Sequence, residues 1–203
     1  MTHPTDFLLL QARLADPAVF EAACAAAVAA WPGGRMQRMA RSSETGEAYG
    51  YLALPARLSL DAQATAPVLQ AFAQALPADA TPRVSRLERA FGVAGASASA
   101  EPHFHYVVEM DPEEGWRDEL FSWYDTEHMP GLASVPGAIR ATRLLNHDHG
   151  PLSLACYDLV ATETLGSPPW LAVRASDWSS RVRPHFTNTR RTMFETLAGA
   201  RTD

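Results

Sequence analysis

A repeated order of predicted elements is the feature that most constrains the fold of this chain. In the first half, apolar runs typical of strands cover residues 7–14, 35–42, 48–54 and 83–93. Helices are predicted after Asp16 and after Asp61, which gives the order strand–helix–strand–strand–helix–strand. In the second half, strands are predicted at 104–110, 138–145 and 152–160, with a closing strand or tail at 187–197. The βαββαβ order therefore occurs twice.

The first helix of each half carries matching signals at its ends. Asp16-Pro17 and Asp111-Pro112 both place a capping aspartate before a proline, which favours the first turn of a helix. Pro32-Gly33 and Pro130-Gly131 follow the two helices, and we expect each helix to stop there. These signals support an internal repeat.

A short segment, residues 95–102, separates the two halves. It reads Gly-Ala-Ser-Ala-Ser-Ala-Glu-Pro, which is small, polar and typical of a linker. We therefore divide the chain into residues 1–95 and 103–203, the latter completed by a helical stretch from Ser167 and by irregular chain or a short helix at 177–184. This predicts an α+β protein with two antiparallel sheets, each covered by helices on one face. Packed sheet to sheet, the halves would form a barrel-like dimer within one chain.

Composition and charge exclude several classes of partner. With a net charge of −6, the chain is a poor match for nucleic acid or for an anionic membrane surface. No apolar run approaches the ~20 residues of a membrane span, and the amino terminus lacks the pattern of a signal peptide, so we expect a cytoplasmic protein. Phosphate-loop, Rossmann and GxSxG motifs are absent, which disfavours nucleotide cofactors and serine-type hydrolysis. Cys24 and Cys156 are expected to be buried and reduced.

Residues 123–130, Trp-Tyr-Asp-Thr-Glu-His-Met-Pro, hold the strongest candidate for chemistry. On an α-helix Tyr124 and His128 are four apart and share one face, and Asp125 lies three residues before His128. A nearby carboxylate and the helix C-terminus would both raise the pKa of the imidazole. His128 could then exchange a proton with a carbon acid or a phenol, with Asp125 orienting it. The alternative is that His128 caps the last carbonyls of the helix and packs under Pro130.

Aromatic and basic side chains around this segment are candidates for substrate binding. Four of the five tryptophans lie in the second half, and such aromatic surface could wall a pocket for a ring-bearing ligand. Trp123 and Tyr124 point to different faces of the predicted helix, so at least one is expected in the core. Tyr106 alternates with histidines along a predicted strand. Arg140 and Arg183 could hold a carboxylate or an enolate-like oxygen, although structural ion pairs are the commoner role of such arginines.

Two pairs of histidines are candidate metal ligands. His103 and His105 alternate along a predicted strand, but no clear third ligand accompanies them. His147 and His149 lie in a predicted turn and are expected to be exposed. We therefore expect neither a metal site nor a cofactor.

The segment 123–130, followed by Val135-Pro136-Gly137 and Arg140, resembles the helix-to-strand signature of EthD-like proteins in the dimeric α/β-barrel (ferredoxin-like) superfamily. Residues 167–170 and 178–184 resemble later segments of relatives in the same group. The resemblance covers roughly residues 103–197. It implies two tandem ferredoxin-like βαββαβ units that form an intrachain dimeric α/β-barrel.

The first half shares only the fold pattern of this resemblance. Ala30-Trp31-Pro32 stands at the place that Glu127-His128-Met129-Pro130 takes in the second half. The resemblance therefore implies that only the second half keeps the site that carries the histidine.

Families of this type carry out cofactor-free chemistry on small apolar molecules or handle them as ligands. They include lactone isomerases, polyketide dehydratases and decarboxylases, quinol-forming monooxygenases and haem-degrading enzymes, so the fold leaves the reaction open. The leading hypothesis is a small cofactor-independent enzyme that moves a proton in an apolar cyclic carbonyl or phenolic molecule, as an isomerase or lyase does. The candidate site residues are His128 and Asp125 for catalysis, and Trp123, Tyr124, Tyr106, Arg140 and Arg183 for substrate binding.

Two other functions are open at this point. The chain could be a non-catalytic ligand-binding or assembly module, in which the signature only builds the turn from helix to strand. It could also bind haem through a histidine axial ligand, a hypothesis with less support. In each case the chain is expected to be a monomer or a homodimer.

Overall fold

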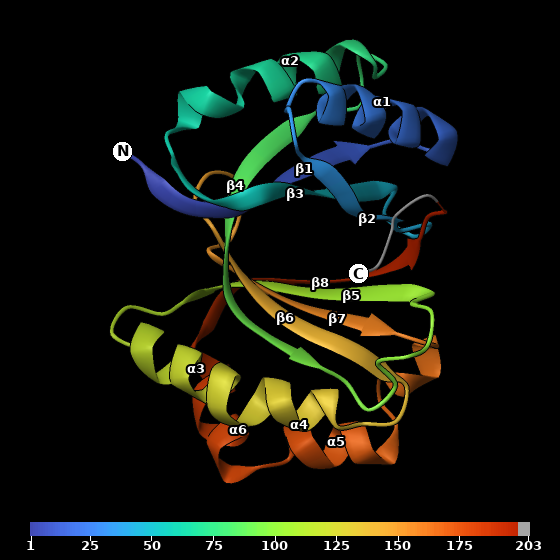
Figure 1. The fold of residues 1–203 in the computed structure, drawn as a ribbon. Coiled ribbons are helices and arrows are strands. Elements are labelled where there is room, and N and C mark those ends of the chain that lie inside the picture. Colours follow the sequence, from blue (N-terminus) through green and yellow to red (C-terminus); the bar gives the residue numbers. More distant parts are fainter. Residues whose placement is uncertain (199–203) are drawn as a thin grey trace. The chain divides into compact units, whose positions relative to one another are not determined.

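The computed structural model describes residues 1–198, which divide into two compact units (Figure 1). Unit 1 contains Met1–Arg89, the hairpin tip Asn146–Gly150 and the described residues from Phe194 onward. Unit 2 contains Ala90–Leu145 and Pro151–Met193. The chain passes from unit 1 to unit 2 within strand β4 (Arg83–Ala94) and returns to unit 1 within strand β8 (Phe186–Thr196).

Unit 1 is an antiparallel sheet with two helices on one face (Figure 1). Its complete strands and helices are β1 (His3–Arg13), β2 (Arg35–Arg41), β3 (Glu47–Leu60), α1 (Pro17–Ala29), the short η1 (Ala62–Thr65) and α2 (Ala66–Gln74). The predicted caps are confirmed, because Asp16 accepts from the Ala18 amide at 2.9 Å and Asp61 from the Ala64 amide at 3.0 Å. Phe20 of α1 and Phe72 of α2 meet edge to face in the core.

Unit 2 repeats this plan with a different set of helices. Its strands are β5 (Phe104–Pro112), β6 (Ala138–Asn146) and β7 (Ser153–Leu159). Its helical segments are α3 (Arg117–Trp123), η2 (Tyr124–His128), α4 (Met129–Ala133), η3 (Thr162–Thr164), α5 (Pro168–Arg174), α6 (Asp177–Val182) and η4 (Arg183–His185). The helices cover one face of the sheet (Figure 1), and the core between them holds Trp123, Leu132 and Tyr157.

The hydrogen bonding of the strands confirms the predicted fold class. Neighbouring strands follow the order β1-β3-β2-β8-β5-β7-β6-β4, and β4 pairs with β1, so the order has the topology of a closed barrel. The protein is α+β, with two tandem ferredoxin-like units and an eight-stranded antiparallel order of strands. None of the helices within residues 1–198 combines the length and apolar character that a membrane span requires.

The start of the long helix in unit 2 differs from the prediction. Asp111-Pro112 ends strand β5 instead of capping a helix, and α3 begins only at Arg117. The Asp111 carboxylate is bound elsewhere: it accepts from the Leu152 amide at 2.7 Å and from Asn188 Nδ2 at 2.9 Å. These two bonds occupy the carboxylate, so it does not cap a helix as the dipeptide alone would favour. Because both partners are distant in sequence, no local pattern reveals them.

The end of this helix also differs from the prediction. Pro130-Gly131 does not stop it, because the helical chain runs on through α4 to Ala133. The preceding turn is wide, and Met129 N–H donates to the Tyr124 carbonyl, five residues back. Pro130 thereby falls in the first turn of a new α-helical segment, where a residue without an N–H is tolerated.

The segment 95–102, predicted as a linker, is bound to its neighbours in unit 2. The amides of Gly95 and Ser97 donate to the carbonyls of Ile139 and Ala138 at 2.7 and 2.9 Å, and the Ala96 amide donates to Ala133 at 2.8 Å. These bonds attach the segment to β6 and to the end of α4.

Gly137, which turns the chain into β6, is expected to tolerate no side chain. Its φ is +93°, and a Cβ there would collide with Oγ1 of the buried Thr164. Gly115 has a similar φ of +82° but open space around it, so it is a matched control. Gly115→Ala should lose about 1–2 kcal/mol through backbone strain alone. Gly137→Ala should lose about 1–3 kcal/mol more through the clash, measured by urea unfolding. Equal losses in both variants would contradict the clash.

Candidate functional site

The turn Tyr124–His128 is π-helical and joins α3 to α4. Turns of this kind carry one more residue than an α-helical turn, so residues five apart come to one side. Trp123 and His128 accordingly stack, with ring centroids 4.1 Å apart and planes at 24°. Tyr124 meets the same imidazole edge to face at 5.6 Å. Both Trp123 and Tyr124 are buried, which confirms the expectation that at least one lies in the core, and both contact His128 from different directions.

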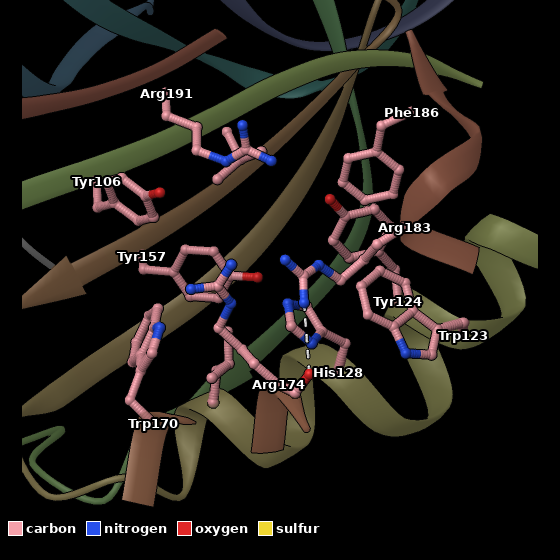
Figure 2. Close-up of a pocket in the computed structure, with 12 residues that line it drawn as sticks. Tyr106, Trp123, Tyr124, His128, Tyr157, Trp170, Arg174, Arg183, Phe186 and Arg191 are labelled. Carbon is pink, nitrogen blue, oxygen red and sulfur yellow. Dashed lines mark hydrogen bonds between the residues drawn. The ribbon is translucent and has the colours of Figure 1, made fainter. Parts of the chain in front are cut away.

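These rings form part of a small pocket in unit 2 (Figure 2). Its cavity volume is about 30 Å³, which is room for roughly two water molecules. The lining residues come from the strands and helices of this unit: Tyr106, Val108, Trp123, Tyr124, His128, Leu132, Tyr157, Trp170, Arg174, Arg183, Phe186 and Arg191. Aromatic walls, one imidazole and three guanidinium groups thus surround one space.

The pocket brings together most of the residues predicted from the sequence. His128, Trp123, Tyr124, Tyr106 and Arg183 all line it. Arg140 and Asp125 do not belong to the lining. Arg140 lies beside a register shift in the pairing of β6 with β7, and its side chain is exposed.

Asp125 has a different partner from the one expected. Its two carboxylate oxygens accept from Arg143 Nε and Nη2 at 2.8 and 2.6 Å. The Arg143 guanidinium also lies over the Phe121 ring at 4.2 Å, so the pair is held from two sides. In contrast, Nδ1 of His128 is buried and accepts or donates no hydrogen bond among residues 1–198. The carboxylate expected to orient the imidazole is therefore engaged elsewhere.

The electrostatics of His128 correct a second expectation. Burial lowers the pKa of the imidazole from 6.5 to about 3, and the charges of Arg174 and Arg183 act in the same direction. From the sequence we predicted a raised pKa for the His128 imidazole, on the assumption that a carboxylate lies within reach and that the helix ends there. Neither applies, since Asp125 binds Arg143 and the helix continues past His128. The imidazole is neutral at physiological pH.

The tyrosines of the pocket are neutral as well. Burial raises the pKa of Tyr124 and of Tyr157, and it raises the pKa of the less deeply placed Tyr106. Burial also lowers the pKa of the Arg183 guanidinium, and Arg174 and Arg191 lower it further by repulsion. No Asp or Glu belongs to the lining within the part of the chain that the structure describes.

Several polar atoms of the lining residues have no partner in residues 1–198. They are Nε1 of Trp123, Nδ1 of His128, Oη of Tyr157 and Nε1 of Trp170. Buried polar atoms are normally hydrogen-bonded, because burial without a partner costs free energy. In Figure 2 the Tyr157 hydroxyl points toward the space beside His128.

Sequence reasoning missed some lining residues for which local signals exist. Val108 lies two residues after Tyr106 and faces the same side of β5. Arg174 lies four residues after Trp170 on α5 and shares its face. Tyr157 and Arg191 give no local signal; Tyr157 is found only through its pairing with Tyr106 across β5 and β7. Leu132 and Phe186 also line the pocket and were not predicted from the sequence.

The candidate metal ligands are engaged in other contacts or exposed. Nδ1 of the buried His105 lies 2.7 Å from Asp158 Oδ1, whereas His103 is exposed. His147 was expected to be exposed but is partly buried, because it stacks on His3 at 4.3 Å. No three His, Cys, Asp or Glu side chains gather as metal ligands within residues 1–198. Cys24 and Cys156 are buried and form no disulfide within the described residues, as expected.

Stability should depend on pH through His128. The unfolded chain takes up a proton on this residue below about pH 6.5, whereas the folded chain resists protonation down to about pH 3. Stability should therefore fall as the pH falls through this window, by up to about 1.4 kcal/mol per pH unit. His128→Gln should lose this contribution, and urea unfolding at a series of pH values measures it. His103→Gln, at an exposed position, should keep the wild-type dependence, and identical profiles for all three proteins would contradict the buried neutral imidazole.

No model of a known protein family matches the sequence, and no curated protein matches it. Solved structures do. A proposed monooxygenase from Lactobacillus acidophilus aligns with a TM-score of 0.62 at 10% identity, over 95% of this chain and 94% of that one. An anthrone oxidase-like protein aligns with a TM-score of 0.61 at 12% identity, over 98% and 95% of the two chains.

A proposed chlorite dismutase aligns with a TM-score of 0.53 at 9% identity, over 98% of this chain and 97% of that one. At such low identity, likeness shows a shared fold and leaves the chemistry open. The chain therefore shares the fold of these structures, a dimeric α/β-barrel built from two ferredoxin-like units, here in one polypeptide.

Proposed function

We propose that the protein is a small cofactor-independent enzyme that moves a proton in a ring-bearing carbonyl or phenolic molecule, with His128 as the base. The observation that carries this proposal is the imidazole itself. It is neutral, buried among aromatic rings and directed to a pocket by a π-helical turn, a feature that is frequent at functional sites.

A neutral imidazole has a free lone pair and can accept a proton from carbon or oxygen. In the proposed reaction, His128 takes a proton from the carbon next to a ring carbonyl, and the electron pair of that C–H bond moves to form an enolate. Return of the proton to another carbon completes an isomerisation. Loss of hydroxide from the carbon next to the enolate carbon, with the proton held by His128 converting it to water, completes a dehydration. A decarboxylation runs through the same enolate in another way: the C–C bond of a β-keto acid breaks, its electron pair forms the enolate as carbon dioxide leaves, and the carbon then takes up a proton.

The aromatic walls favour a ring as the body of the substrate. Trp123, Tyr124, Tyr157, Trp170 and Phe186 offer ring faces and edges on several sides of the pocket. A cavity of about 30 Å³ is too small for a whole ring, so binding requires side chains to move. Arg174 and Arg183 are half-buried and Arg191 is exposed, which makes these long side chains the movable part of the lining.

The resemblance to EthD-like proteins and the solved structures agree with this class of substrate. One of the similar structures carries the name anthrone oxidase-like protein. Anthrone is a ring ketone with an acidic C–H, and removal of that proton is the step proposed for His128. This agreement supports the proposal through likeness of fold and of the signature at 123–130.

A non-catalytic ligand-binding module is the second candidate. The observation that favours it is that Nδ1 of His128 has no hydrogen-bond partner in residues 1–198, carboxylate or other, and that burial leaves the imidazole a weak base. This candidate also uses the pocket, but it predicts ligand binding without proton transfer.

Deuterium exchange tests the proposal directly. Anthrone and 2-tetralone, each in deuterated buffer without oxygen, should exchange their acidic C–H faster with the wild type than in buffer alone, as followed by proton NMR. His128→Gln should lower the rate by about 10²-fold or more, the range expected for loss of a general base. A wild type no faster than buffer with either ketone would contradict the enzymatic proposal and favour the binding module.

Asp125→Asn should separate the structural from the catalytic role of this carboxylate. Because Asp125 binds Arg143 at 2.6 and 2.8 Å and not His128, the variant should keep the exchange rate within about threefold of wild type while its melting temperature falls. A loss of exchange as large as that of His128→Gln, with unchanged stability, would restore Asp125 as the residue that orients the imidazole.

A further inference from the structure

The pocket carries a concentration of positive charge that contrasts with the rest of the chain. The net charge of the protein is −6. The pocket lining nevertheless contains Arg174 at the end of α5, Arg183 in η4 and Arg191 in β8, and no Asp or Glu among the described residues. Figure 2 shows the three guanidinium groups directed into the same space from these separate elements.

The three guanidinium groups lack acidic partners within residues 1–198. Arg183 Nη1 reaches only the Arg174 carbonyl, at 3.5 Å, which is the outer limit of a hydrogen bond. Three carboxylates of the neighbouring helical segments are bound to other groups: Asp125 to Arg143, Glu119 to Arg181 and Trp178, and Glu127 to Ser176. Unbalanced like charges close together destabilise a fold, most of all at the half-buried Arg174 and Arg183, so their presence calls for an anion that binds there.

The unpaired polar atoms of the lining point to the same kind of ligand. Nε1 of Trp170 is a donor that cannot accept, and the Tyr157 hydroxyl can donate; both residues are 1% exposed, and neither atom has a partner in the described chain. Together with the arginines they offer hydrogen bonds to a group rich in acceptors. A carboxylate has two such oxygens and suits a guanidinium fork.

We propose that the ligand of this pocket is an aromatic acid, whose carboxylate or equivalent oxyanion is bound by Arg174, Arg183 and Arg191. The proposal rests on the proposed function for the reaction that follows, and it names the class of substrate for that reaction. The cavity of about 30 Å³ has the size of a carboxylate group, and the ring lies against the aromatic walls once the arginines have moved around the anion.

Anion binding has a consequence for His128. The charges of Arg174 and Arg183 contribute to the low pKa of the imidazole, together with burial. A bound carboxylate offsets these charges, so the imidazole becomes a stronger base when the substrate is present. The two aromatic rings that contact the imidazole, Trp123 and Tyr124, are uncharged at neutral pH.

Titration with matched acids and amides tests the anion site. Binding of benzoate and 2-naphthoate, and of their neutral analogues benzamide and 2-naphthamide, is measured by calorimetry and by quenching of tryptophan fluorescence. Each acid should bind at least about tenfold more tightly than its amide, and added salt should reduce the difference. Equal affinities for acid and amide, or no binding of either acid, would overturn the proposal.

Arginine variants locate the site. Arg174→Gln, Arg183→Gln and Arg191→Gln should each weaken 2-naphthoate about tenfold and leave 2-naphthamide unchanged, because each removes one charge-assisted contact. Arg117→Gln is the matched control, since Arg117 is an exposed arginine on α3 outside the pocket lining. A control that weakens the acid as much as the pocket variants would show general attraction by the net charge and would overturn the site.

Two further readouts keep the proposal separate from a structural role and from the enzymatic proposal. The pocket variants should melt at or above the wild-type temperature, because each removes a repelling charge; a lower melting temperature with equal loss of acid and amide binding would show that the arginines only support the fold. Acid binding without deuterium exchange would leave the anion site standing and remove the enzymatic proposal. Deuterium exchange by a protein that binds acids no more tightly than amides would support the enzymatic proposal and remove the anion site.

Discussion

The wide turn at Tyr124–His128 is the constraint on which the candidate site depends. In an uninterrupted α-helix, two residues five apart lie about 140° apart around the axis and cannot stack. The π-helical hydrogen bond from Met129 to Tyr124 removes this offset, so that Trp123 packs on the imidazole while Tyr124 meets its edge. The same turn shifts the helical register and allows Pro130 within the helical chain. One local irregularity thus places the imidazole, its aromatic neighbours and the continuing helix.

The pocket combines two arrangements that oppose stability. A neutral imidazole is buried without a hydrogen-bond partner for Nδ1 in the described chain, and three arginines line the same pocket without an acid among the lining residues. Asp125, the nearby carboxylate that could balance them, is held by Arg143, which in turn packs on Phe121. Such unpaired polar and charged groups lower folding stability and are typical of sites that bind a ligand or carry out catalysis.

Much of the architecture could be predicted because its signals are local. The caps at Asp16 and Asp61 act on amides two and three residues away, and both were predicted correctly. The cap at Asp111 failed for a reason that no local pattern reveals: its carboxylate binds Leu152 and Asn188, which are 41 and 77 residues away. The four-residue spacing of Tyr124 and His128 correctly predicted that the two side chains share one side of the helix, and both line the pocket. The assumption of a regular α-helix did not predict that Trp123 stacks on His128.

The sequence by itself determined the doubled order of strands and helices, the helix caps, and the segment that holds His128, because alternation, spacing and capping depend on neighbours a few residues apart. Only the tertiary structure decided that Arg174, Arg183 and Arg191 line the same pocket as the imidazole and that Asp125 binds Arg143. It also reversed the expected direction of the pKa shift of His128. Burial and charge act through space, and the distances that govern them join residues from α5, η4 and β8 that are remote from His128 along the chain.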